Sequence, residues 1–289
     1  MDIGKLGVWY FVDGLRSSDT AALAKRIEAL GYGALWIPET VGKNSVATAA
    51  WLLANTTKLT VATGIMNIYH REPGVTAAAQ KSLAEQSGGR FLLGLGVSHK
   101  PIVEGVRGLT YGPPVATMRR YLESMAAAPY TAVAPEPEPV TVIAALGPRM
   151  LELAATACAG AHPYFASPEH TRMARDIMGP EPMLCVEQKV ILETDPARAR
   201  ELAKPVAKMY QQLPNYRNNW RRIGLDESDI DNFSDKFIDT TFAWGDIDAI
   251  KDRVQAHFDA GASHVCVQPV NPNGRLGDLH WECLEALMA

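Results

Sequence analysis

Strand-like and helix-like segments alternate along the whole chain, and this alternation constrains the fold more than any other feature. Short runs rich in apolar and β-branched residues are each followed by a longer, amphipathic segment. The runs cover residues 6–11, 34–37, 59–65, 91–96, 140–145, 161–164, 184–192 and 264–268. Eight consecutive strand–helix units predict an α/β fold, a single (β/α)8 TIM barrel over residues 1–289. A doubly wound sheet with an appended domain is the alternative.

The segments between the strands have the period expected of helices that cover a barrel. Apolar residues recur at helical spacing between 246 and 260, and the last helix is predicted at 276–288. Between about 210 and 243 the chain instead becomes polar and aromatic. We interpret this stretch as an insertion before the last strand.

Charge and hydropathy exclude several classes of partner. The chain has 28 Lys and Arg against 32 Asp and Glu, without a basic run, which argues against nucleic acid as a partner. No apolar stretch is long enough to cross a bilayer, and no basic and apolar leader opens the sequence. We therefore expect a cytoplasmic protein that acts on a small molecule and has no membrane partner.

The four cysteines are scattered along the chain without a C-x-x-C pair. They are Cys158, Cys185, Cys266 and Cys283. This spacing argues against a zinc site or a disulfide framework, so we predict no metal. We interpret the cysteines as small buried residues, and a nucleophilic thiol at Cys266 is the alternative.

Two neighbouring predicted strands contain glycine near their carboxyl ends and then turn polar. One run includes Gly64, and the other ends at Gly94-Leu95-Gly96 and continues to His99. Glycine allows a ligand to approach the backbone closely. We therefore expect Gly64 and Gly96 to leave a flat slot that forms the floor of a pocket.

The Gly94-Leu95-Gly96 turn is not a dinucleotide fingerprint. That fingerprint needs a third glycine three residues further on, where this chain has His99. Pro101 then delays the next helix, and no acidic residue ends a second strand at the distance expected for a ribose contact.

Two predicted helix starts follow the fifth and sixth strands. Gly147-Pro148 is one, with Arg149 nearby, and Ser167-Pro168 is the other. The free N–H groups and the positive dipole end of such starts can hold a phosphate. Ordinary helix capping is the alternative at each of them.

Six short motifs lie at or near the ends of the predicted strands and follow one another along the chain. They are Leu35-Trp36-Ile37-Pro38-Glu39, Ala62-Thr63-Gly64-Ile65, Arg71-Glu72-Pro73, the segment 89–96, Ala144-Ala145-Leu146-Gly147-Pro148 and Gly160-Ala161-His162-Pro163-Tyr164. With these motifs, between residue 6 and about residue 207, the chain resembles the bacterial luciferase-like superfamily. It is especially similar to the branch of oxidoreductases that depend on a deazaflavin, coenzyme F420.

This resemblance implies a cofactor and its place. The three-ring system of coenzyme F420 (8-hydroxy-5-deazaflavin), or of FMN as the alternative, would lie across strands three to five, beside a non-proline cis peptide at Gly64-Ile65. The residues expected at the cofactor are Thr63, Gly64, Ile65, Met66, Gly96, Val97, Ser98, Ala145, Leu146, Gly147, Pro148, Ser167, His170 and Thr171. Barrels of this family usually pair through helices two and three, so we expect a homodimer.

Glu39 and His99 are the predicted catalytic residues. They follow strands two and four, at the barrel face where active sites gather, and both can transfer protons. Second choices are His70, His162 and Tyr164. Branch members that act on sugar phosphates and alcohols have a histidine after the strand-two acid and a glutamate near the strand-four exit. This chain has Thr40 and His99 there, so its substrate stays open.

We therefore predict an oxidoreductase that exchanges a hydride between coenzyme F420 and a small organic substrate. One alternative is an FMN-dependent luciferase-like monooxygenase. Another is a phosphate-binding barrel isomerase or lyase, which the lack of a glycine-rich turn at 267–272 disfavours. A non-catalytic ligand-binding barrel is the third.

Overall fold

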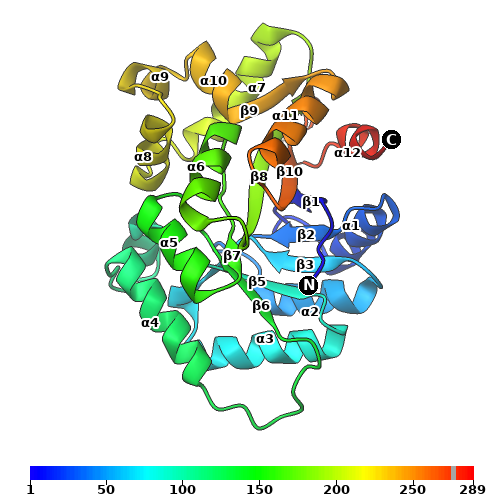
Figure 1. Ribbon diagram of the computed structural model, residues 1–289. Coiled ribbons are helices and arrows are strands. Elements are labelled where there is room, and N and C mark those ends of the chain that lie inside the picture. Colours follow the sequence, from blue (N-terminus) through cyan, green and yellow to red (C-terminus); the bar gives the residue numbers. More distant parts are fainter. Residues whose placement is uncertain (275–277) are drawn as a thin grey trace.

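The computed structural model describes residues 1–274 and 278–289 and contains a closed barrel of eight parallel strands (Figure 1). The barrel strands are β1 (Leu6–Trp9), β2 (Ala34–Ile37), β3 (Thr60–Thr63), β5 (Phe91–Gly96), β6 (Val140–Ile143), β7 (Gly160–Ala161), β8 (Met183–Leu192) and β10 (His264–Pro269). Neighbouring strands pair in parallel, and β10 closes the barrel by pairing with both β8 and β1. The predicted (β/α)8 fold is confirmed.

Helices connect the strands and surround the barrel. They are α1 (Ser17–Ala29), α2 (Ser45–Asn55), α3 (Pro73–Ser87), α4 (Pro114–Ala127), α5 (Pro148–Ala157), α6 (Pro168–Met178), α7 (Pro196–Lys208), α11 (Ile247–Asp259) and α12 (Trp281–Met288). The helix starts predicted at Gly147 and Ser167 are N-caps of α5 and α6. The last helix begins at Trp281, later than predicted, and residues 276–277 of that prediction lie outside the described residues.

The predicted third strand, 59–65, is interrupted in the structure. β3 ends at Thr63, the Gly64–Ile65 peptide is cis as the resemblance implied, and β4 (Met66–Asn67) then pairs with β5. The first, fifth and sixth strands also end before their predicted ends, at Trp9, Ile143 and Ala161. The residue directly after each of these strands still donates a backbone hydrogen bond to the neighbouring strand: Tyr10 to Trp36, Ala144 to Leu95 and His162 to Ile143.

The insertion is helical and lies at the carboxyl ends of the strands. It contains α8 (Pro214–Arg222), α9 (Glu227–Asn232) and α10 (Asp235–Thr241), and it ends in β9 (Phe242–Gly245), a strand that the sequence did not predict. β9 pairs with the last four residues of β8, and Figure 1 shows α10 beside β9, with α9 and α8 further out. Trp220 packs against Phe165 and Phe237, with ring centroids 5.4 and 4.8 Å apart. The aromatic residues of this stretch therefore form a second apolar core over the barrel.

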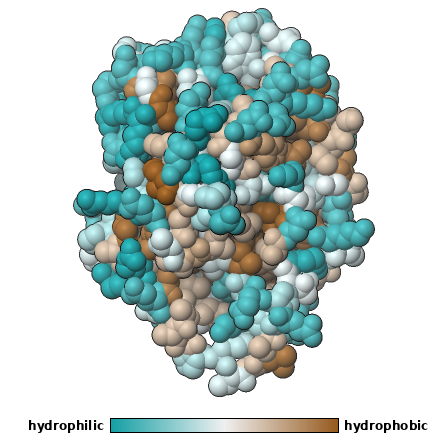
Figure 2. All heavy atoms as spheres, viewed as in Figure 1, coloured by the Kyte–Doolittle hydropathy of each residue, from teal (hydrophilic) through white to brown (hydrophobic). Residues whose placement is uncertain are grey.

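The barrel interior is filled by side chains. Trp9, Trp36, Cys185 and Cys266 are buried there, and in the described residues all four cysteines are free thiols. Figure 2 shows a face on which hydrophilic side chains predominate, with hydrophobic ones scattered among them. Within residues 1–274 and 278–289, no helix combines the length and the apolar character that crossing a membrane requires.

Candidate active site

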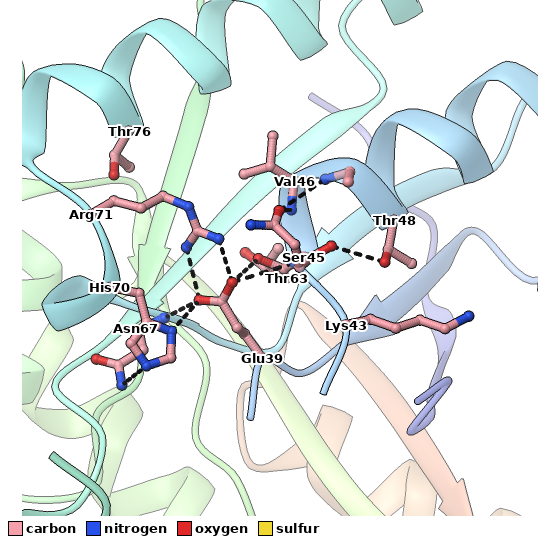
Figure 3. Close-up of polar contacts among 12 residues, drawn as sticks. Glu39, Lys43, Ser45, Val46, Thr48, Thr63, Asn67, His70, Arg71 and Thr76 are labelled. Carbon is pink, nitrogen blue, oxygen red and sulfur yellow. Dashed lines mark hydrogen bonds and ion pairs between the residues drawn. The ribbon is translucent and has the colours of Figure 1, made fainter. Parts of the chain in front are cut away.

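Glu39 follows β2 and lies at the centre of a buried polar cluster (Figure 3). Its Oε1 accepts hydrogen bonds from Arg71 and from Ser45 Oγ (2.9 Å). Its Oε2 accepts from Arg71 Nη1 (2.8 Å), His70 Nδ1 (3.1 Å) and the backbone N–H of Asn67 (3.2 Å). The side chain of Glu39 is only 4% exposed, so these donors replace water around the carboxylate.

This bonding holds Glu39 as an anion. Burial alone would raise the pKa of its carboxyl group, but the bonds from Arg71, Ser45 and Asn67 outweigh it and lower the pKa to about 2. At neutral pH, Glu39 has no proton to donate, and both oxygens are already engaged. Its catalytic role stays a prediction. The geometry favours a positioning role, because the carboxylate ties the end of β2 to the start of α2 and to the segment after β4.

The same cluster fixes the proton on His70. Asn67 Oδ1 accepts from the Tyr69 N–H (3.0 Å), so Asn67 Nδ2 faces His70 Nε2 (3.0 Å) and donates to it. His70 Nδ1 therefore carries the proton and donates it to Glu39. Burial is the largest influence on the pKa of His70 and lowers it. His70 is thus a neutral ring with both nitrogens occupied.

His99 lies in a different cluster, between the end of β5 and the insertion. It is half-buried, with its ring centroid 5.8 Å from that of Tyr216 on α8. Burial lowers the pKa of His99, and a hydrogen bond with the Asn215 side chain only partly opposes this. The segment after His99 includes a π-helical turn, η2 (Pro101–Val106), and Arg107 then donates to the Thr40 carbonyl (3.0 Å). The chain after β5 therefore joins the insertion to the rim near Glu39.

The two glycines of the predicted pocket floor face side chains of the protein itself. Trp9 Nε1 donates to the Gly64 carbonyl (2.9 Å), and a Cβ on Gly64 would lie 2.5 Å from that same nitrogen. A Cβ on Gly96 would overlap the side chain of Ile65. Glycine is therefore needed at both positions for packing. The flat slot stays a prediction, and Ile65 lies between the two glycines with a partly exposed side chain.

His162 is a buried neutral ring with one unused nitrogen. Its Nδ1 lies 2.8 Å from the Cys185 carbonyl, so Nδ1 carries the proton. The ring stacks on Trp36 with centroids 4.2 Å apart, and burial lowers its pKa to about 4. Its Nε2 is buried without a hydrogen-bond partner, and a Cβ on Gly64 would lie 3.1 Å from it.

The start of α5 lies beside a positive charge from the insertion. His170 Nε2 donates to the Leu146 carbonyl (3.0 Å), which leaves His170 Nδ1 as a buried acceptor without a partner. A Cβ on Gly147 would lie 3.5 Å from Arg222 Nη2, which α8 brings across. A guanidinium and the first turns of two helices therefore meet at this point, where an anionic group fits.

The other residues predicted at the cofactor are spread around these clusters. Thr63 Oγ1 exchanges hydrogen bonds with the backbone of Gly94 (2.8 Å each). The hydroxyl of Thr171 is engaged with His257 Nδ1 of α11 (2.8 Å), and Ser167 Oγ caps α6. Of the remaining ones, Met66 and Ala145 are buried, Val97, Ser98 and Leu146 are half-buried, and Pro148 is exposed.

Sequence reasoning missed two charged residues inside the barrel. Glu187 and Lys189 lie on β8 with fully buried side chains, and Lys189 Nζ is 3.1 Å from Glu187 Oε2. Burial raises the pKa of Glu187 and lowers that of Lys189 to about 8, while their mutual attraction opposes both shifts. The sequence does contain a signal for this pair. Two oppositely charged residues at positions i and i+2 of an apolar strand point to the same face and are expected to pair when buried.

Four buried histidines predict a strong loss of stability in mild acid. Burial lowers the pKa of His162, His170 and His264 to about 4 and that of His257 to about 3. The unfolded chain therefore binds protons first, and the stability of these neutral rings is lost as the pH falls from about 6.5 to about 4. We expect the free energy of unfolding by urea to drop by at least ~2 kcal/mol between pH 7 and 5. A flat profile over that window would contradict the neutral, buried state of these rings.

Comparisons with known proteins show the family of the chain and agree with its barrel fold. The family model of luciferase-like monooxygenases matches residues 12–264. A Mycobacterium tuberculosis protein, named as a candidate coenzyme F420-dependent oxidoreductase, is 24% identical over 311 aligned positions, which cover 86% of this chain and 89% of the relative. The F420-dependent tetrahydromethanopterin reductase of Methanopyrus kandleri superposes with a TM-score of 0.76 at 18% identity, over 98% of this chain and 97% of that one. An FMN-bound Baeyer–Villiger monooxygenase from Pseudomonas putida superposes with a TM-score of 0.73 at 14% identity, over 98% of this chain and 96% of that one.

Proposed function

Because the chain belongs to the luciferase-like monooxygenase family, we propose that it is an oxidoreductase that uses coenzyme F420 to exchange a hydride with a small organic substrate. The observation that carries the choice of a redox cofactor with a phosphate is the anion-binding corner at the start of α5, formed by Arg222 and the free N–H groups of the first turn of α5. Coenzyme F420 carries a phosphate, which such a corner would hold. The relative from Mycobacterium tuberculosis supports the choice of a deazaflavin.

The residues of the strand ends suit a planar cofactor. Ile65 offers a partly exposed apolar surface beside Gly96, and Trp9 donates a hydrogen bond to the Gly64 carbonyl. When bound, the deazaflavin would supply or accept a hydride at its C5 position. The task of the protein is then to place the substrate carbon against that position and to manage one proton.

FMN-dependent monooxygenation is the second candidate function. The FMN-bound monooxygenase from Pseudomonas putida has the same fold, and FMN also carries a phosphate. The anion-binding corner therefore suits both cofactors. The two functions differ in their chemistry, because a deazaflavin lacks N5 and does not activate dioxygen.

Fluorescence titration of the purified protein with coenzyme F420 and with FMN tests the choice. We expect micromolar binding of the deazaflavin, weaker binding of FMN and no oxygen uptake. Tight FMN binding with oxygen uptake by the reduced complex would favour the monooxygenase. Binding of neither cofactor would contradict the redox proposal as a whole.

Replacing Arg222 tests the anion-binding corner. We expect Arg222→Gln to weaken binding of coenzyme F420 about 10- to 100-fold, since a charge-assisted hydrogen bond contributes roughly 1.5–3 kcal/mol. The matched control is Arg221→Gln on the same helix, because Arg221 pairs with Glu227 instead. An equal loss of affinity in the two variants would contradict the assignment.

A further inference from the structure

A row of aromatic rings leads from Gly64 across the mouth of the barrel. Trp9, bonded to the Gly64 carbonyl, contacts Phe11 on one side and Tyr164 on the other, with ring centroids 4.7 and 4.8 Å apart. Tyr164 follows β7 and is half-buried. Its phenol therefore lies on the rim, one ring away from the backbone that the proposed function places at the cofactor.

The hydroxyl of Tyr164 belongs to a directed chain of hydrogen bonds. It donates to Gln268 Oε1 (2.8 Å), which can only accept. The hydroxyl of Tyr210, 2.7 Å away, must then donate to the oxygen of Tyr164. Tyr210 comes from the insertion and Gln268 from β10, so three separate segments hold this chain in place. A proton that leaves Tyr164 can be replaced directly from Tyr210.

A buried charged pair lies against the ring of Tyr164, and its lysine can stabilise the phenolate that forms when Tyr164 donates its proton. Lys189 Nζ lies 3.8 Å from the centroid of the Tyr164 ring, where a positive charge stabilises a developing phenolate. Glu187 opposes this effect, and it also neutralises the lysine. The other titratable groups that face Tyr164 are Tyr210 and Tyr216 of the insertion. Burial is the main cause that raises the pKa of Tyr164 well above 10, so it holds its proton at neutral pH.

We propose that Tyr164 is a catalytic residue that protonates the oxygen of a ketone or aldehyde substrate as the carbonyl carbon is reduced. The inference rests on the proposed function, which supplies the hydride. The O–H of Tyr164 first turns from Gln268 to the substrate oxygen. The carbonyl carbon then gains that hydride, the π-electron pair moves onto the oxygen, and the oxygen takes the proton of Tyr164. Tyr164 regains a proton from Tyr210, which exchanges with water, and the product is an alcohol. Lys189 is a positioning residue in this account.

The chemistry of the rim also selects the substrate. Tyr164, Tyr210 and Gln268 are uncharged hydrogen-bonding groups, and Phe11 and Trp9 beside them are apolar. The two charges of this cluster, on Glu187 and Lys189, are paired with each other. We therefore infer an uncharged carbonyl compound with an apolar or aromatic body.

Infrared spectroscopy of a bound probe tests the hydrogen bond without turnover. The probe is acetophenone labelled with carbon-13 at the carbonyl, added to the protein loaded with oxidised coenzyme F420. A hydrogen bond from Tyr164 lowers the carbonyl stretching frequency, so we expect a lowered band in the wild type and its loss in Tyr164→Phe. Tyr32→Phe is the matched control, because it removes another buried phenol, which bonds to the Leu284 carbonyl. The same band in all three proteins, or no bound acetophenone, would overturn the inference.

Kinetics then separate this inference from the proposed function. With reduced coenzyme F420 and acetophenone, Tyr164→Phe should lower kcat about 10²- to 10⁴-fold, the usual contribution of a general acid, while the affinity for coenzyme F420 stays unchanged. Tyr210→Phe keeps the Tyr164 hydroxyl, so it should keep the lowered band and lose about tenfold in kcat. Failure of coenzyme F420 to bind the wild type would count against the proposed function. Full activity of Tyr164→Phe, with the cofactor bound, would count against Tyr164 alone.

Discussion

Glu39→Gln is expected to lower the free energy of unfolding by about 3–5 kcal/mol, because it leaves the guanidinium of Arg71 buried without its carboxylate. The side chain of Arg71 is 12% exposed, so water does not replace the lost partner. Urea unfolding at pH 7, followed by circular dichroism, measures the loss. The double variant Glu39→Gln/Arg71→Met should recover part of it, since the two residues interact directly.

The control for this prediction is Glu285→Gln. Glu285 pairs with Arg26, but both side chains are nearly half exposed, so the variant should cost less than ~1 kcal/mol. If Glu39→Gln costs no more than Glu285→Gln, the cluster around Glu39 does not hold the strand ends in place. The outcome also bears on catalysis, because a positioning residue is expected to affect stability as well as rate.

Lys189→Met should destabilise the fold by a similar amount, about 3–5 kcal/mol. It removes the charge partner of Glu187, whose carboxylate is fully buried and already has a raised pKa. Glu187→Gln added to Lys189→Met should restore most of the stability, because a neutral amide oxygen can still accept the Phe165 N–H (2.7 Å). Thermal unfolding of the single and double variants measures both effects. A double variant no more stable than Lys189→Met would show that the buried charge is not the cause.

The barrel could be predicted from the sequence because its pattern is local. Each strand is a short apolar run and each helix has its own period, so eight units could be counted without knowing how they pair. Several strands end earlier than predicted. Apolar residues such as Phe11 and Tyr164 continue past the last ladder bonds, so the runs looked longer than the strands are. β9 was missed because its four residues follow directly on α10.

The parts of the site that depend only on neighbouring residues could be predicted. The parts that depend on contacts between distant segments could not. The start of α6 at Ser167-Pro168 is confirmed, because a cap needs only neighbouring residues. The contact of Arg222 with Gly147 and the position of Lys189 beneath Tyr164 depend on the insertion folding over the closed barrel. Arg71 stood in a recognised motif, yet its partner Glu39 is 32 positions away and its role was not seen.

A crystal structure of the protein with oxidised coenzyme F420 tests the central claim most directly. We predict that the deazaflavin ring lies against Ile65 at the carboxyl ends of β3 and β5, with its phosphate beside Arg222 and the start of α5. The face of the ring away from Ile65 should be open toward Tyr164. A cofactor bound elsewhere on the barrel, or a phosphate away from Arg222, would contradict the account.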